Sequence, residues 1–260
     1  MSRSFIARPW AYLKLLKNLH DQQYDLVVQI GRGSFSGMTC MNSLNARYRV
    51  GAGKWAKVVC NIRVDLSAAK HAYDRPMAVA RTLGMSCRNR PFYATTQQER
   101  ENARLRLSTV SLSDGNSTVP FAALFIGGHK DKRWPIECWI DLAGKLRQAH
   151  KRIIILLGPE EVSMGARVRE ALGSGVPVFD PFPLRDFAAV LQQARLVVTP
   201  DTGPMHLAVA LDVPTIAIIQ SNASLRYAPR GDRDVVLRQP TSGKVFKTIQ
   251  AHNVWSELSA

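Results

Sequence analysis

Residues 195–219 read RLVVTPDTGPMHLAVALDVPTIAII, and this stretch decides the fold class. Residues 195–199 form a short apolar run with adjacent valines, which is typical of a strand buried on both faces. The loop 200–204 then supplies a capping residue and a proline at a first helical position. We predict a helix over 205–211 and a second buried strand over 213–219.

The loop in this stretch puts a capping residue, Asp201 or Thr202, at a helix start directly after a strand. In open parallel sheets, ligands bind beyond the carboxyl ends of strands, and the free N–H groups of a helix start favour phosphate. Most junctions of this kind hold no ligand. Here the polar side chains of Asp201, Thr202 and His206 lie in a segment otherwise made of core residues, so the loop is a candidate phosphate site.

Upstream of this stretch the same alternation continues. After Pro120, apolar runs of strand length alternate with helical patterns of ten or more residues, which predicts a parallel, doubly wound sheet. The expected strands are 121–126, 152–157 and 176–179, and the expected helices are 135–150, 161–172 and 184–194.

The first half of the chain shows a shorter version of the pattern, ending in a polar segment. We predict helices over 10–20, 34–44 and 65–83, a buried strand over 24–30 and a short strand over 48–51. Residues 95–120 are polar and charged, then rich in Ser, Asp, Gly and Asn, which is typical of a connection between domains. The predicted domains are therefore 1–115 and 116–260.

Composition narrows the class of protein. A chain of 260 residues that is 46% hydrophobic can bury a sizeable core in one or two domains. No apolar run is long enough to predict a transmembrane helix. The four cysteines lie far apart with no C-x-x-C pair, which favours reduced thiols and argues against a zinc site or a disulfide framework.

The net charge of +15 is unevenly distributed. Residues 1–115 carry 18 Lys and Arg against 7 Asp and Glu, whereas residues 116–260 carry 17 against 13. A basic half suggests an anionic partner such as a phosphorylated lipid, a membrane surface or nucleic acid, and ordinary solvated surface charge is the alternative. Nucleic acid is not expected, because no aromatic and basic motif or known binding module accompanies the charge.

Three short motifs follow the expected strands of the C-terminal half in order. K-x-W-P-x-E spans 132–137, G-P-x-E spans 158–161, and D-T-G-x-x-H-L-A spans 201–208. Their order and spacing resemble those of the motifs of glycosyltransferase family 9, the ADP-heptose:lipopolysaccharide heptosyltransferases. YDLVVQIGRG at 24–33 and residues 47–51 are similar to the second half of that family's N-terminal domain, so the resemblance covers most of the chain.

The resemblance implies an α/β, GT-B-like fold, in which two Rossmann-like domains with parallel sheets face a cleft and the C-terminal one binds most of the donor. A nucleotide diphosphate-sugar needs its diphosphate charge neutralised, and N–H groups at a helix start do this. The residues expected to bind the donor are Lys132, Glu161, Thr202, Gly203, Met205 and His206.

Side-chain chemistry suggests a role for each polar member of this set. Lys132 would stabilise the negative charge that builds on the leaving diphosphate, and Thr202 and His206 would add a hydroxyl and a ring N–H. Glu161 would accept hydrogen bonds from ribose hydroxyls and Asp201 from the transferred sugar. Lys132 and Asp201 are the candidate catalytic residues. The resemblance implies no metal and no cofactor, with ADP-heptose as the donor substrate.

Several of these residues also have a structural interpretation. Trp134 and Trp139 are more typical of a core than of a substrate platform. Glu160 is expected to face solvent, and Glu161 is chosen over it by the register of the motif. His206 without the resemblance would be read as a capping or core histidine.

One element of the family's pattern has no match in the printed sequence. The family's N-terminal domain begins with a strand that ends in a glycine–aspartate loop, and that aspartate resembles a general base for the acceptor hydroxyl. We expect either a truncated, inactive chain, which is the favoured interpretation, or another base, with Asp25 and Asp65 the nearest candidates. An incomplete N-terminal sheet would expose an edge and apolar surface, which favours association or instability.

The leading hypothesis is a glycosyltransferase that moves heptose from ADP-heptose to the lipopolysaccharide inner core with inversion. Its acceptor would be phosphorylated and lipid-linked, at the cytoplasmic face of the inner membrane, and the basic half would suit the anionic surface of a peripheral enzyme. The alternative is a non-catalytic or truncated relative that binds the nucleotide-sugar and has lost the base.

Overall fold

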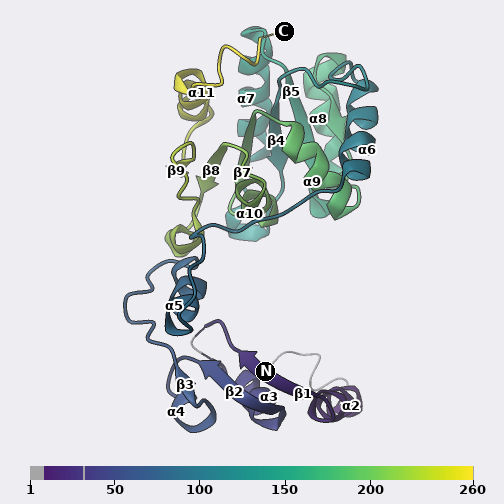
Figure 1. Cartoon of the computed structure of the whole chain (residues 1–260). Helices are drawn as coiled ribbons and strands as arrows, with labels where there is room; N and C mark the ends of the chain where they lie inside the picture. Colours follow the sequence, from purple (N-terminus) through teal and green to yellow (C-terminus); the bar gives the residue numbers. More distant parts are fainter. Residues whose placement is uncertain (1–8, 32, 260) are drawn as a thin grey trace. The chain divides into compact units, whose positions relative to one another are not determined.

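The computed structural model describes residues 9–31 and 33–259 and divides the chain into two compact units, 1–89 and 90–260. Each unit is an α/β assembly around its own parallel sheet (Figure 1). Among the described residues, no helix combines the length and apolar character needed to cross a membrane.

The N-terminal unit contains a three-stranded parallel sheet in the order β1-β2-β3. Its elements are α2 (Pro9–His20), β1 (Gln23–Val28), α3 (Phe35–Ser43), β2 (Asn45–Gly51), α4 (Ala56–Val59), β3 (Ile62–Arg63) and α5 (Asp74–Thr82). The strand predicted over 24–30 is present as β1. Arg32, in the glycine-containing segment that follows it, lies outside the described residues.

The prediction that this first strand is buried is wrong. Val27 packs against a small cluster under α3 and α4, but Leu26, on the opposite face, is 42% exposed, and Val28 is exposed as well. The predicted helix over 65–83 is also too long. Asp65 accepts hydrogen bonds from the backbone N–H and the hydroxyl of Ser67, at 2.8 and 2.9 Å, in a local turn, and the helix begins only at Asp74.

The C-terminal unit contains a six-stranded parallel sheet in the order β6-β5-β4-β7-β8-β9. Its strands are β4 (Ala122–Ile126), β5 (Ile153–Leu157), β6 (Val178–Phe179), β7 (Leu196–Pro200), β8 (Thr215–Ile219) and β9 (Val235–Arg238). Every residue of β4, β5, β7 and β8 is buried, as expected for strands with helices on both faces.

Helices cover both faces of this sheet (Figure 1). One face packs against α7 (Ile136–Gln148), α8 (Gly165–Leu172) and α11 (Ser242–Ala251). The other packs against α6 (Gln97–Ser108), α9 (Leu184–Gln193) and α10 (Gly203–Ala210). The four remaining elements are short 3-10 helices, η1 (Lys130–Lys132), η2 (Pro159–Met164), η3 (Gly173–Gly175) and η4 (Asn222–Tyr227).

Helix α6 moves the domain boundary from the predicted 115/116 to 89/90. Its charged sequence suggested a connection, but Thr96 and Glu99 form a reciprocal capping box, and Glu99 also accepts a hydrogen bond from Arg185 of α9 at 3.0 Å. Ala103 and Leu107 of α6 are buried in the core of the C-terminal unit. The segment is therefore part of that unit.

Two further predictions need correction or addition. The helix expected over 161–172 is split, because η2 precedes α8 and turns the chain before the regular helix begins. Strand β9 and helix α11, after residue 220, were not predicted. The three apolar residues of the edge strand β9 are only partly buried, and α11 fully buries Val245 and Ile249.

Candidate functional site

The predicted site residues come from three loops that meet at one edge of the C-terminal sheet. The loops follow β4, β5 and β7, which are adjacent in the order β5-β4-β7. The chain runs from β4 outward through β5 and β6, then returns to place β7 on the other side of β4. The carboxyl ends of β4 and β7 are thus the point where the winding reverses, which is where open α/β sheets bind ligands.

Lys132 and Asp201 are joined across that point. Lys132 Nζ lies 2.8 Å from Asp201 Oδ2, so the loops after β4 and β7 are linked by an ion pair. The Asp201 carboxylate is buried, at 3% exposed, whereas the Lys132 side chain is 40% exposed. Apart from this ion pair, Oδ2 has no hydrogen-bond partner among the described residues. Asp201 thus anchors a cation whose outer side faces solvent.

Glu161 lies on the other side of the β4 loop. It is 3% exposed, while the side chain of its neighbour Glu160 is 56% exposed, in agreement with the expected contrast between the two. Arg133 Nη2 lies 3.1 Å from Glu161 Oε1. Burial raises the pKa of the Glu161 carboxyl, and the nearby Arg133 guanidinium opposes that rise.

Glycines allow the chain to pass close to this carboxylate. A Cβ placed on Gly158 would lie 2.4 Å from Glu161 Oε2, and one on Gly127 would lie 3.4 Å from the same atom. The first distance is too short for any side chain, so glycine at 158 is required for Glu161 to occupy this position.

The helix start after β7 has the expected form, with one difference. Thr202 is the N-cap of α10 in an extended conformation, and its hydroxyl donates weakly to Pro200 O at 3.3 Å rather than capping the helix. Gly203 is exposed, and a Cβ there would meet nothing within 4 Å. Met205 differs from expectation, because its N–H already donates to Thr202 O at 3.1 Å and its side chain is fully buried.

His206 is half-buried one turn into the helix. Burial lowers the pKa of its imidazole, with Asp201 opposing the shift and Lys132 adding to it. The shift favours the neutral imidazole, which carries one ring N–H. Its ring centroid lies 6.3 Å from that of Tyr227 in an edge-on arrangement. Tyr227 and Arg133 were missed by sequence reasoning, since neither occupies a defining position of a motif.

Trp134 of the first motif and the nearby Trp139 are core residues, as predicted. Trp134 and Trp139 are buried, with ring centroids 4.8 Å apart in an edge-on contact. The indole N–H of Trp134 donates to Pro240 O at 2.9 Å, which ties the β4 loop to the start of α11. Trp134 thus fixes the loop that carries Lys132 and Arg133.

The candidate bases named from the sequence belong to the N-terminal unit. Asp25 is an exposed residue of β1. Asp65 follows β3, and its hydrogen bonds from Ser67 lower the pKa of its carboxyl, which weakens it as a base.

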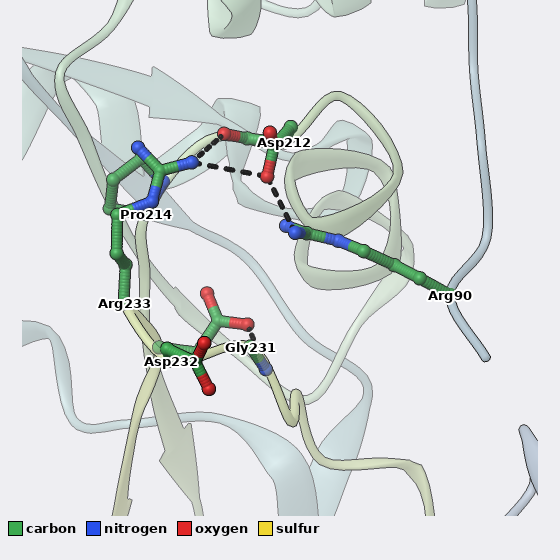
Figure 2. A pocket seen from close by; sticks show the side chains of 7 residues that line it. Arg90, Asp212, Pro214, Gly231, Asp232 and Arg233 are labelled. Atoms are coloured by element: carbon green, nitrogen blue, oxygen red, sulfur yellow. Dashed lines mark hydrogen bonds and ion pairs between the residues drawn. The ribbon is translucent and has the colours of Figure 1, made fainter. Parts of the chain in front are cut away.

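A second polar cluster lies at the opposite edge of the C-terminal sheet, before β8 (Figure 2). Asp212, at a positive φ of 63°, is paired with both Arg90 and Arg233, at 2.5 and 3.1 Å. Asp234 accepts hydrogen bonds from Gly231 N and Thr215 N, at 2.8 and 3.1 Å. These contacts tie residue 90 and the start of β9 to the end of α10, which is a structural role.

Comparison with known proteins assigns the fold and the family. The model of glycosyltransferase family 9 (heptosyltransferase) matches residues 12–253. The chain belongs to this family. Lipopolysaccharide heptosyltransferase 1 of Escherichia coli K12 is 29% identical over 198 residues, which is 75% of this chain and 59% of that protein. Lipopolysaccharide core heptosyltransferase OpsX of Haemophilus influenzae is 23% identical over 236 residues, covering 86% of this chain and 65% of that protein.

Solved structures of other family 9 members show the same architecture. E. coli heptosyltransferase WaaC with ADP superimposes with a TM-score of 0.69 at 24% identity, over 96% of this chain and 78% of that one. The family 9 protein from Veillonella parvula gives a TM-score of 0.71 at 21% identity, over 92% and 70%. The fold is therefore GT-B-like, as predicted, and the chain spans less than two thirds of the two curated relatives named above.

Proposed function

We propose that this family 9 member transfers heptose from ADP-heptose to the lipopolysaccharide inner core. The observation that carries the proposal is the pairing of exposed Lys132 with buried Asp201 at the reversal point of the C-terminal sheet. The names of the curated relatives, which are lipopolysaccharide heptosyltransferases, support the sugar and the acceptor.

In this proposal the diphosphate of the donor lies over the start of α10. The backbone N–H of Gly203, the Thr202 hydroxyl and the neutral ring of His206 donate to it, and Lys132 contributes a positive charge. Met205 shapes the site from beneath through its buried side chain, because its N–H is engaged within the turn. Glu161 accepts from the ribose hydroxyls, and Asp201 accepts from the transferred sugar while it holds Lys132.

The chemical step is a displacement at the anomeric carbon. A bond forms between the acceptor oxygen and that carbon as the bond to the diphosphate breaks, which inverts the configuration. The acceptor proton passes to a general base, and ADP leaves with the electron pair. Lys132 lowers the barrier because its charge lies where negative charge grows on the leaving group. No step in this scheme uses a metal ion.

The acceptor side of the proposal rests on charge. An excess of Lys and Arg in residues 1–115 suits a phosphorylated, lipid-linked acceptor and the anionic surface on which it lies. We place the protein at the cytoplasmic face of the inner membrane as a peripheral enzyme.

The direct test is ADP release from ADP-heptose in the presence of a truncated core acceptor. If the chain has its own general base, it will turn over ADP-heptose, also in a chelator, whereas the double variant Lys132→Ala, Asp201→Ala will release no ADP above background. Equal release by both proteins would overturn the catalytic assignment. If the chain is a donor-binding relative instead, saturating ADP-heptose at a hundred times its Kd will stabilise it by about 2.7 kcal/mol without turnover.

A further inference from the structure

Consecutive residues of the β4 loop reach in opposite directions to the two neighbouring loops. Lys132 pairs with Asp201 after β7, and Arg133 pairs with Glu161 in η2, after β5. Because β4 lies between β5 and β7 in the sheet, one loop supplies a cation to each side. The first pair contains the candidate catalytic residues. The second pair has no role in the scheme above beyond the Glu161 carboxylate itself.

The Arg133 side chain is held by three contacts. Its Nε donates to Gly128 O at 2.6 Å, and its Nη2 lies 2.9 Å from Glu160 Oε2 as well as 3.1 Å from Glu161 Oε1. The bond to Gly128 fixes the guanidinium to the backbone of its own loop. This bond and the contacts with the two glutamates direct the guanidinium toward Glu161.

The Glu161 carboxylate is poised to accept a further hydrogen bond. Its Oε1 is buried and has no hydrogen-bond partner among the described residues, although it lies within ion-pair distance of Arg133. An ionised carboxylate is an acceptor only, so any hydrogen bond that completes Oε1 must come from a donor such as a hydroxyl group. A carboxylate oxygen can accept more than one hydrogen bond, so a ligand hydroxyl can bind Oε1 in addition to the contact with Arg133.

We propose that Arg133 is a positioning residue that holds Glu161 as a charged acceptor for the vicinal hydroxyls of the donor's ribose. It thereby makes the site selective for ribonucleotides. This inference rests on the proposed contact between Glu161 and ribose. Arg133 itself touches Glu161 and not the nucleotide.

The electrostatics agree with this assignment. Burial favours the neutral form of Glu161 and raises the pKa of its carboxyl, and the charge of Glu160 adds to that rise. Arg133 is the main opposing influence. Without it the carboxyl would be protonated at a higher pH and would lose its strength as an acceptor.

The test compares binding of ADP and 2′,3′-dideoxy-ADP by calorimetry, with the full chain and three variants, between about pH 6 and pH 9. We expect the unaltered chain to prefer ADP by roughly ten- to a hundredfold at every pH, as for hydrogen bonds to a charged group. Arg133→Met should lose most of that preference at low pH and regain part of it as the pH rises. Arg133→Lys keeps the charge but not the bond to Gly128, so it should restore a flat pH profile.

Arg195→Met is the matched control. It removes an arginine that is also paired with a glutamate, Glu257 at 3.2 Å, but lies just before β7 and outside the three site loops. It should keep the ADP preference of the unaltered chain. An Arg133→Met protein with unchanged preference and a flat pH profile would overturn the inference while leaving the proposed function intact. ADP binding without preference for the ribose would overturn the Glu161 contact, and no binding of ADP at all would overturn the proposed function itself.

Discussion

The two sheets of this protein contain similar apolar runs, yet their strands differ in burial. Every residue of β4, β5, β7 and β8 is buried, whereas in β1 only Tyr24 and Val27 are even partly buried. The difference lies in the helices. The C-terminal sheet has three on each face, while the exposed side chain of Leu26 shows a face of β1 that no described element covers.

This contrast extends to the polar residues at the strand ends. In the C-terminal unit, Lys132 and Asp201 come from different loops and meet because the sheet holds those loops side by side. In the N-terminal unit, Asp65 bonds to Ser67 only two residues away. A carboxylate engaged by its own turn needs no sheet to position it. Of these carboxylates, only Asp201 depends on the sheet for its partner.

The largest expected effect concerns where that unit begins. We expect residues 90–260, produced alone, to fold cooperatively and bind ADP with the affinity of the full chain. Residues 116–260 should not, because they lack α6, whose Leu107 is fully buried against α9 and β4. Circular dichroism melting and calorimetry with ADP would measure both properties.

The fragment 90–260 also keeps Arg90, which pairs with Asp212 and donates to Val209 O at 3.1 Å (Figure 2). A fragment 91–260 is a control for that contact and should melt slightly lower. If residues 116–260 fold and bind as well as residues 90–260, the boundary at 89/90 is wrong.

A core substitution in each sheet tests the difference in burial directly. Leu156→Ala in β5 should lower the free energy of unfolding by about 2–5 kcal/mol, since it leaves a cavity among fully buried side chains. Leu26→Ala in β1 should change it by less than about 1 kcal/mol, because that side chain is already 42% exposed. Urea denaturation of each variant gives both values, and equal losses would contradict the contrast.

The strand-end residues provide the matching test of function. Lys132→Ala should lower the turnover number about 10²- to 10³-fold, as when one donor to a developing negative charge is removed. Asp65→Asn should leave turnover unchanged, because Ser67 already lowers the pKa of that carboxyl. Initial rates of ADP release measure both. A drop of about 10²-fold or more for Asp65→Asn would instead identify Asp65 as the general base.

The sequence predicts the motif residues of the site but not the contacts between its loops. The three motifs place Lys132, Glu161 and Asp201 at strand ends, and the structure brings the loops together as expected. Arg133 could not be predicted, because its importance depends on the distance between two loops and not on its own position in a motif. The engaged N–H of Met205 is also a detail of turn geometry that residue types do not determine.

The fold shows the same division between local and long-range information. The strands β4 to β8 of the C-terminal sheet were predicted within a few residues, since continuous apolar runs flanked by turns are a local signal, whereas β9 was missed. Burial of β1 was predicted wrongly, because it depends on what covers the second face. Helix α6 was missed because its composition is mostly polar, although two of its residues, Ala103 and Leu107, are buried.

The smallest expected effect is a pH dependence in the docking of α6. The hydrogen bond from Arg185 and the capping bond from Thr96 lower the pKa of Glu99 to about 2. A carboxyl whose pKa is lower in the folded state adds stability that is complete above its unfolded pKa of about 4.3 and is lost as the pH falls. The difference in unfolding free energy between the unaltered chain and Glu99→Gln should thus be constant above about pH 5 and shrink between about pH 4.5 and pH 2. Arg185→Met should abolish most of this pH dependence, because it removes the main partner of Glu99. If the difference in unfolding free energy between the unaltered chain and Glu99→Gln stays constant down to about pH 2, Glu99 does not hold α6 through its charge.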